Sequence, residues 1–157
     1  MCIRDSFTAE LAQHPFLRGM SDDEIERLAS CVEGIFEYGE DEVLFRSGGE
    51  ARSCFLISGG EVAIEIHSPG AGRRIVQTVA RGQVLGWSWL FEPYRTTFDA
   101  RVLTPAKAVV LDGARLREAM EEHADLGYSL LLRISRLIGG RLQATRLQLL
   151  DLYASRD

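Results

Sequence analysis

The spacing of hydrophobic and polar residues changes twice along the chain. Up to about residue 32 apolar positions recur every three or four residues, from about 35 to 112 they form short runs between glycines, and from about 113 to 153 the helical spacing returns. A spacing near 3.6 residues is typical of an amphipathic helix, and short apolar runs between turn residues are typical of strands. The pattern therefore predicts an α+β domain in which helices flank a central β-structure.

A helix is predicted to begin at Ser21. Ser21 and Glu24 form a capping box, in which the serine hydroxyl and the glutamate carboxylate accept hydrogen bonds from backbone N–H groups at the helix start. The apolar stripe behind this cap consists of Ile25, Leu28, Ala29 and Val32. Residues 1–6, MCIRDS, fit no element and are interpreted as a non-native or disordered leader, so that residues 7–157 form a single domain.

The central part of the chain is rich in β-branched and aromatic residues. Its predicted strands are 35–38, 43–45, 54–58, 61–66, 75–80, 98–102 and 106–111. Several short strands between glycine-rich turns indicate a β-sandwich or barrel. Gly59-Gly60 predicts a tight hairpin, because such turns need positive φ angles. Val62, Ile64 and Ile66 alternate with other residues, which predicts one buried face for their strand.

Two C-terminal helices are predicted, one over residues 114–122 after a cap at Asp112 and one from a cap at Asp125 to about residue 153. The apolar stripe of the second helix continues for about four heptads, more than packing on a small domain needs. It either pairs with a second copy of the chain or lies flat on its own domain. The candidate dimer interface consists of Leu131, Ile134, Ile138, Leu142, Thr145, Leu149 and Leu152. Gly139-Gly140 permits close approach of two backbones or marks a hinge.

The segment 82–102, GQVLGWSWLFEPYRTTFDARV, carries the candidate binding chemistry. Gly86 opens a short turn that Pro93 ends, and unpaired N–H groups at the start of a helical turn attract anions. Arg95, Thr96 and Thr97 follow and could complete a charge-assisted anion site. The alternative is an ordinary loop, since glycine, aromatic residues and proline are common in loops.

Composition excludes several classes of function. The chain has 157 residues, 46% hydrophobic and 26% charged, with a net charge of −5. An acidic balance disfavours a nucleic-acid surface, and no apolar run approaches the ~18 residues of a membrane span. The expected location is the cytoplasm. The three cysteines form no CxxC pair.

Enzymatic activity is not expected. His14, His67 and His123 are far apart in the predicted elements and form no metal site with a carboxylate. The chain has no Gly-x-Ser-x-Gly, Walker A or dinucleotide-binding motif.

The order of elements and two motifs resemble a known family. LFRSGGEARSCFLISGGEVAIEI at residues 44–66 and the pair Gly82 and Gly86 are similar to the cyclic nucleotide-binding domain, the sensor domain of catabolite-activator-type, Crp/Fnr-like bacterial regulators. The resemblance covers about residues 16–153. It implies a double-stranded β-helix, or jelly-roll, β-barrel with a short N-terminal and a long C-terminal helix, with the roll at about 35–112 and the C-terminal helices at about 113–153.

The resemblance also implies candidate ligand-binding residues. Gly86 begins the segment that corresponds to the family's phosphate-binding cassette, but Trp87 occupies the position where the family has a glutamate that bonds the ribose 2′-hydroxyl. An indole has no acceptor for that bond. The resemblance matches Arg95 to the phosphate-binding arginine and Thr145 to a purine-binding position. The candidate ligand site is Gly86, Trp87, Ser88, Trp89, Arg95, Thr96, Thr97 and Thr145.

Three ligand states remain open: a cyclic nucleotide such as cyclic AMP, another small anionic ligand in a flatter and more apolar site, or no ligand because both indoles fill the pocket. In the regulators that the chain resembles, a DNA-binding domain follows the long helix, whereas this sequence ends at Asp157. We therefore expect a homodimeric, ligand-sensing regulatory domain that acts on a protein partner without direct nucleic-acid or membrane binding. The alternative is a ligand-free interaction and dimerisation scaffold of the same fold.

Overall fold

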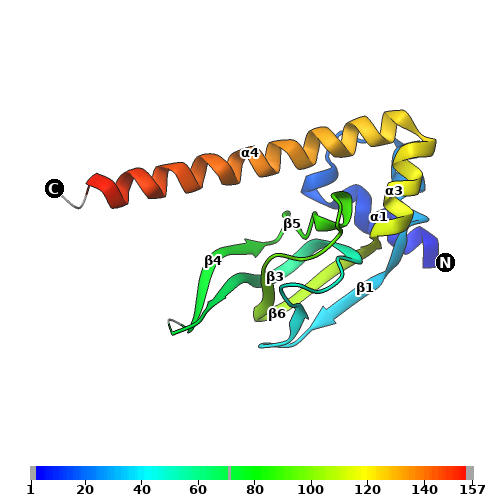
Figure 1. Cartoon of the computed structure of the whole chain (residues 1–157). Helices are drawn as coiled ribbons and strands as arrows, with labels where there is room; N and C mark the ends of the chain where they lie inside the picture. The colour runs from blue at the N-terminus through cyan, green and yellow to red at the C-terminus, as the bar shows by residue number, and fades with distance from the viewer. Residues whose placement is uncertain (1–2, 71, 155–157) are drawn as a thin grey trace.

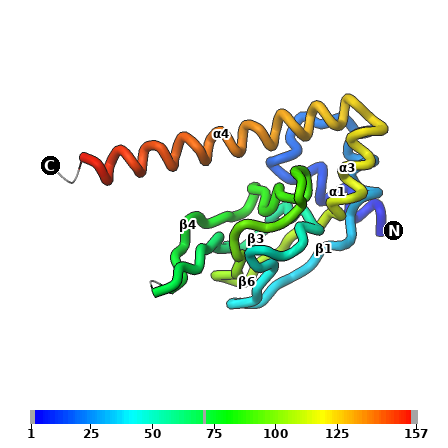
Figure 2. The backbone as a smooth tube through the Cα atoms, in the orientation of Figure 1, coloured from blue at the N-terminus to red at the C-terminus, as the bar shows by residue number. Residues whose placement is uncertain are grey.

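The computed structural model describes residues 3–70 and 72–154, which form a β-roll with helices on one side. Figure 1 shows the long helix α4 running beside the roll and extending past it, so that the two ends of the chain lie at opposite ends of the molecule. The tube in Figure 2 follows the chain from the N-terminal helices through the roll to α4. The helices are α1 (Ile3–Gln13), η1 (Pro15–Leu17), α2 (Asp22–Ala29), η2 (Ser88–Leu90), α3 (Gly113–Glu122) and α4 (Ala124–Ala154).

The sheet is antiparallel and is built on two long strands. Its strands are β1 (Val32–Tyr38), β2 (Val43–Phe45), β3 (Ser53–Ser68), β4 (Gly72–Ala80), β5 (Val84–Leu85) and β6 (Asp99–Asp112). The order β1-β6-β3-β4 forms the main path, while β2 pairs with β6 and β5 pairs with β3. The expected α+β jelly-roll fold is confirmed. Closure into a barrel is not, because β1 and β4 do not pair with each other.

Gly59-Gly60 lies inside β3 and makes no hairpin, so that prediction is wrong. The pairing of β3 with β6 shifts register on both sides of Gly59. Gly60 has a φ of 76°, and a Cβ there would collide with the backbone oxygen of Pro105 in the paired strand. The glycines thus let both long strands bend while they stay paired, since a bulge increases local twist and bending. The predicted strands 54–58 and 61–66 are therefore one strand, as are 98–102 and 106–111.

β3 is buried on both faces, which explains its nearly continuous apolar sequence. Phe55 and Ile57 pack in the interior of the roll, whereas Leu56 between them packs against the helices. Further along the strand Ala63 is fully buried while Ile66 is 44% exposed. The prediction of a single buried face over residues 62–66 is therefore wrong, because Ala63 and Glu65 on the other face are buried as well.

The structure confirms the predicted caps at Ser21 and Asp112, whereas the predicted boundaries of the helices differ from the observed ones. The Ser21 hydroxyl accepts a hydrogen bond from the backbone N–H of Glu24 at 3.2 Å, and Asp112 Oδ2 accepts one from Arg115 at 2.9 Å. Asp125 lies in the first turn of α4 and does not cap it.

Residues 3–6 belong to α1, so the prediction that they fit no element is wrong, and residues 1–2 lie outside the described part of the chain. The sequence missed α1, whose fully buried side chain is Leu11.

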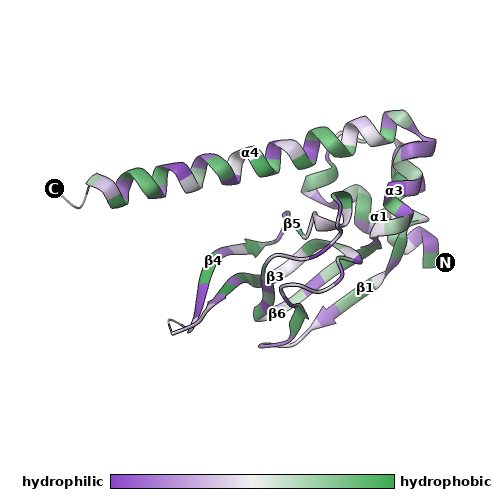
Figure 3. Cartoon of the chain, viewed as in Figure 1, coloured by the Kyte–Doolittle hydropathy of each residue, from purple (hydrophilic) through white to green (hydrophobic). Residues whose placement is uncertain are grey.

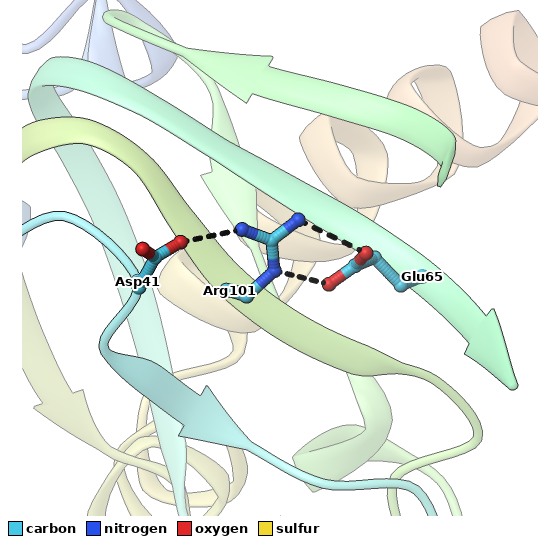
Figure 4. A network of polar contacts seen from close by, with 3 residues as sticks. All are labelled: Asp41, Glu65 and Arg101. Carbon is cyan, nitrogen blue, oxygen red and sulfur yellow. Dashed lines mark hydrogen bonds and ion pairs between the residues drawn. The ribbon is translucent and has the colours of Figure 1, made fainter. Parts of the chain in front are cut away.

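An ion-pair network fixes the turn before β2 to the two long strands (Figure 4). Arg101 on β6 donates from Nε to Glu65 Oε1 on β3 at 2.9 Å and from Nη1 to Asp41 Oδ1 at 2.7 Å. These hydrogen bonds, that to Glu65 first, raise the pKa of Arg101. The Glu65 side chain is only 4% exposed. A buried carboxylate needs such a paired cation, because burial removes the water that would solvate its charge.

His14 joins the N-terminal helices to β3. Its Nε2 donates to the backbone oxygen of Ile57 at 2.8 Å, and its Nδ1 accepts from the backbone N–H of Phe16 at 3.2 Å. This pairing requires a neutral ring, since a protonated Nδ1 cannot accept. Burial lowers the pKa of His14 and so does the charge of Arg81, while the bond to Ile57 and the charge of Glu10 raise it by less.

We predict that His14 makes the free energy of unfolding depend on pH. The folded protein holds the ring neutral, so the unfolded chain binds more protons below the usual histidine pKa of about 6.5, and stability falls as the pH drops through that value. Urea unfolding at about pH 7.5 and about pH 5.5 should show a smaller pH dependence for His14→Gln than for the wild type. The control is His67→Gln at the exposed end of β3, which should keep the wild-type dependence. Equal pH dependence in all three proteins would contradict the prediction.

Candidate functional site

A cavity of about 290 Å³ lies between the open side of the roll and α4. Its walls come from β2, β3, β5 and the segments 50–53, 86–88 and 96–98, and helix α4 contributes one residue, Arg141. The lining residues are Leu44, Phe45, Glu50, Ala51, Arg52, Ser53, Phe55, Ile64, Leu85, Gly86, Trp87, Ser88, Thr96, Thr97, Phe98 and Arg141. The cavity therefore contains most of the predicted cassette residues together with a residue that the sequence analysis did not assign to it.

Gly86 shapes the floor of the cavity. It has a φ of 85°, in the left-handed region that favours glycine, and a Cβ there would lie 3.3 Å from the backbone oxygen of Ser53. The short helix η2 begins two residues later, as the turn predicted after Gly86 requires. This arrangement brings Trp87 and Ser88 to the cavity wall.

The two tryptophans have different positions. Trp89 is 1% exposed, packs in the core shared with the helices and donates from Nε1 to the backbone oxygen of Gly86 at 3.0 Å. It does not line the cavity, so its placement among the ligand-binding residues is wrong. Trp87 does line the cavity. The interpretation that both indoles fill the pocket is also wrong, because a hydrogen bond to Gly86 and core packing hold Trp89 elsewhere.

Arg141 reaches from α4 onto the cavity wall. Its Nη2 donates to the backbone oxygen of Val84 at 3.1 Å, and its guanidinium carbon lies 4.3 Å from the centroid of the Trp87 ring. Nε and Nη1 are shielded from solvent and have no hydrogen-bond partner among the described residues. Burial lowers the pKa of Arg141 to about 10, so the group remains protonated at neutral pH.

Arg95 does not occupy the position that the sequence predicted. Its side chain is exposed, does not line the cavity and donates from Nη1 to the backbone oxygen of Gly48 at 3.1 Å. The structure therefore does not bring Arg95 together with the other predicted ligand-binding residues, because its guanidinium bonds the Gly48 carbonyl at the surface. Thr96 and Thr97 do line the cavity, and the Thr96 hydroxyl donates to the backbone oxygen of Arg46.

Thr145 also lies outside the cavity. Its hydroxyl donates to the backbone oxygen of Arg141 at 2.9 Å, one turn back along α4, and its side chain is exposed. Residues four positions apart share one face of a helix. The signal that could have identified Arg141 was thus its spacing from Thr145 in RLQATR, one helical turn before the position that the resemblance matches to a ligand contact.

An ion pair lies on the rim of the cavity. Glu50 Oε2 accepts from Nε of Arg52 at 3.0 Å and from its Nη2 at 2.9 Å. Both side chains are largely exposed, at 64% and 76%. The two charges of this pair cancel, which leaves Arg141 as the cavity-lining charge without an opposite charge paired to it among the described residues.

Hydrophobic and hydrophilic residues alternate along α4 (Figure 3), and many of the apolar residues in its second half are exposed. Of the predicted interface, Leu131, Leu142, Leu149 and Leu152 are 44% to 63% exposed, and Ile138 is partly buried against the core. Ile134 is 3% exposed and belongs to the domain's own core, so its assignment to a dimer interface is wrong. Gly139 and Gly140 have open space around their Cα atoms. No helix in the described part of the chain has the length and apolar content to cross a bilayer.

Comparison with known proteins confirms the family resemblance. Residues 35–123 match the cyclic nucleotide-binding domain. A putative potassium channel protein of Rhodopseudomonas palustris is 27% identical over 117 residues, which cover 74% of this chain but 27% of that protein. The chain thus spans about a quarter of the length of this curated relative.

Solved structures share the fold over nearly the whole chain. A putative cyclic nucleotide-binding protein from Geobacter metallireducens is 26% identical with a TM-score of 0.74, covering 90% of this chain and 99% of that one. A cyclic nucleotide-binding domain from Methylobacillus flagellatus is 21% identical with a TM-score of 0.80, covering 93% of this chain and 84% of that one. The second likeness, at this identity, concerns the fold alone.

Proposed function

The chain belongs to the cyclic nucleotide-binding domain family, and we propose that it is a ligand-sensing regulatory domain whose cavity differs from the family's usual site in how it holds an anion. The observation that carries this proposal is Arg141, a cation on the cavity wall with two nitrogens that lack partners among the described residues. The usual acid is replaced by Trp87, and Arg95 lies outside the cavity. The specificity is therefore altered rather than lost.

The energetics favour an anionic ligand. A buried donor without a partner destabilises the folded state by about 1–3 kcal/mol, and more when the group is charged. Hydrogen bonds between a guanidinium and an anionic oxygen are about twice as strong as neutral ones. An anion that enters the cavity can therefore pair with nitrogens that the protein leaves unpaired, once the Arg141 side chain turns toward it.

Binding at Arg141 would couple the cavity to α4. Arg141 is held by the Val84 carbonyl and by Trp87, so an anion must compete with both contacts. The preceding helix is tied to the same region, since Arg117 on α3 lies 4.0 Å from the centroid of the Tyr94 ring and donates to the backbone oxygen of Trp89. A ligand that prefers one placement of Arg141 shifts the population of α3 and α4 positions, and a partner protein would respond to that shift.

The exposed half of α4 supplies the output surface in this proposal. Leu142 and Leu149 lie one heptad apart on the same face and are about half exposed. A heptad stripe of this kind buries itself by pairing with the same stripe of a second helix. We therefore assign a homodimer through α4.

The alternative is a ligand-free dimerisation scaffold. The observation that favours it is that Val84 and Trp87 hold Arg141 against the roll, so contacts within the protein position this side chain. The two functions differ in whether any small molecule changes the stability of the domain.

We predict that a bound or added anion stabilises the protein through Arg141. Native mass spectrometry of the purified protein, followed by a thermal-shift screen of cyclic and linear nucleotides and organic acids, should identify a ligand. At 100 times its dissociation constant a ligand stabilises by about 2.7 kcal/mol. Arg141→Gln should abolish this effect, whereas Arg95→Gln outside the cavity should keep it. A screen in which no compound binds would favour the ligand-free scaffold. A stabilising effect that Arg95→Gln abolishes would favour the family's usual site.

We also predict that Leu149→Glu converts the dimer to a monomer, because a carboxylate in an apolar helix pair loses its hydration. Leu147→Glu is the matched control: Leu147 is 62% exposed on the same helix but lies on a face away from the heptad stripe. Sedimentation velocity should show a monomer for Leu149→Glu and a dimer for Leu147→Glu and the wild type. A wild-type monomer at micromolar concentration, or the reverse order of the two variants, would contradict the α4 dimer.

A further inference from the structure

We infer that the cavity binds a small aromatic carboxylate rather than a sugar phosphate; this inference rests on the proposed sensing function and assigns the chemical class of its ligand. Four features of the cavity support it: its size, its aromatic walls, the cation Arg141, which has no paired acid in the described part of the chain, and the acid Glu50, which is paired with Arg52. Each of these concerns residues that line the cavity.

The aromatic walls of the cavity suit a flat, apolar ligand. The rings of Phe45 and Phe55 lie with centroids 6.1 Å apart and planes inclined by 37°, and Phe98 and Trp87 add further aromatic surface to the lining. Aromatic rings prefer such tilted or offset contacts with another ring. The volume of about 290 Å³ lies at the small end of the usual ligand pockets of about 300–1,000 Å³. A one- or two-ring ligand fits this space and surface.

The charge of the cavity suits a monoanion. Arg52 is neutralised by Glu50 on the rim, which leaves Arg141 as the cavity-lining cation without a paired acid among the described residues. Its Nε and Nη1 are shielded from solvent, so the side chain has to turn toward a ligand to bind it. A guanidinium presents its donors in a planar fork that matches the two oxygens of a carboxylate. The hydroxyls of Ser88 and Thr97 add polar groups to the lining that can donate to a ligand oxygen.

The cavity is poorly suited to a sugar. A bound ribose needs acceptors for its hydroxyl protons, and the acid that lines the cavity, Glu50, accepts at Oε2 from two nitrogens of Arg52, so a ribose would have to share a carboxylate that Arg52 already neutralises. Trp87 has one donor and no acceptor, and the Thr96 hydroxyl is directed to backbone carbonyls of the 46–49 turn. Sugar hydroxyls placed against Trp87 and the phenylalanine rings of the lining would lose their bonds to water without replacement, which is costly.

Isothermal titration calorimetry of the full chain tests this inference with indole-3-acetate, its neutral analogue indole-3-acetamide and cyclic AMP. The acid and the amide have nearly the same shape and differ in charge, so a site that contains a guanidinium should bind the acid more tightly. We expect indole-3-acetate to bind at least tenfold more tightly than the amide and than cyclic AMP. Arg141→Gln should reduce the affinity for the acid to that for the amide, and Arg141→Lys should give an intermediate value because it keeps the charge but not the fork.

The outcomes separate the ligand class from the sensing function. Cyclic AMP that binds more tightly than indole-3-acetate in an Arg141-dependent way would overturn the carboxylate inference and leave the sensing proposal intact. Equal affinity for the acid and the amide, or no binding of either at millimolar concentration, would overturn the inference. The comparison of acid and amide in the wild-type protein holds even if an Arg141 variant fails to fold.

Discussion

The contact between Arg141 and the roll is the interaction on which the functional account depends. It places a cation from the long helix over an indole of the cassette and against a strand carbonyl, and it leaves two donors without partners among the described residues. The same side chain lines the cavity. One residue therefore belongs both to the candidate ligand site and to the helix that carries the exposed apolar stripe.

The roll makes this arrangement possible. β3 and β6 are long and bend together at Gly60, where the Pro105 backbone approaches too closely for any side chain. Their bend encloses the aromatic lining on one face, while Leu56 and its neighbours on the other face pack against the helices. The ion pair of Arg101 and Glu65 joins the same two strands. The shape of the cavity thus follows from backbone constraints and paired charges rather than from the ligand chemistry itself.

The sequence predicted the features that depend on near neighbours. The caps at Ser21 and Asp112 and the turn at Gly86 need only residues a few positions apart, and all three are present. Features set by contacts between distant residues were missed. Whether Gly60 makes a turn or a bulge depends on Pro105, and whether Arg95 faces the cavity depends on the carbonyl of Gly48. The place of Arg141 depends on how α4 crosses the roll, which its helical period alone does not determine.

A crystal structure of the protein with its co-purified or added anion would test the central claim most directly. The account predicts that the anion lies in the cavity within hydrogen-bond distance of the Arg141 guanidinium, against the aromatic lining, and that α4 differs in position from the ligand-free protein. An anion bound by Arg95 outside the cavity, or an Arg141 side chain extended into solvent with the cavity filled by protein side chains, would contradict it.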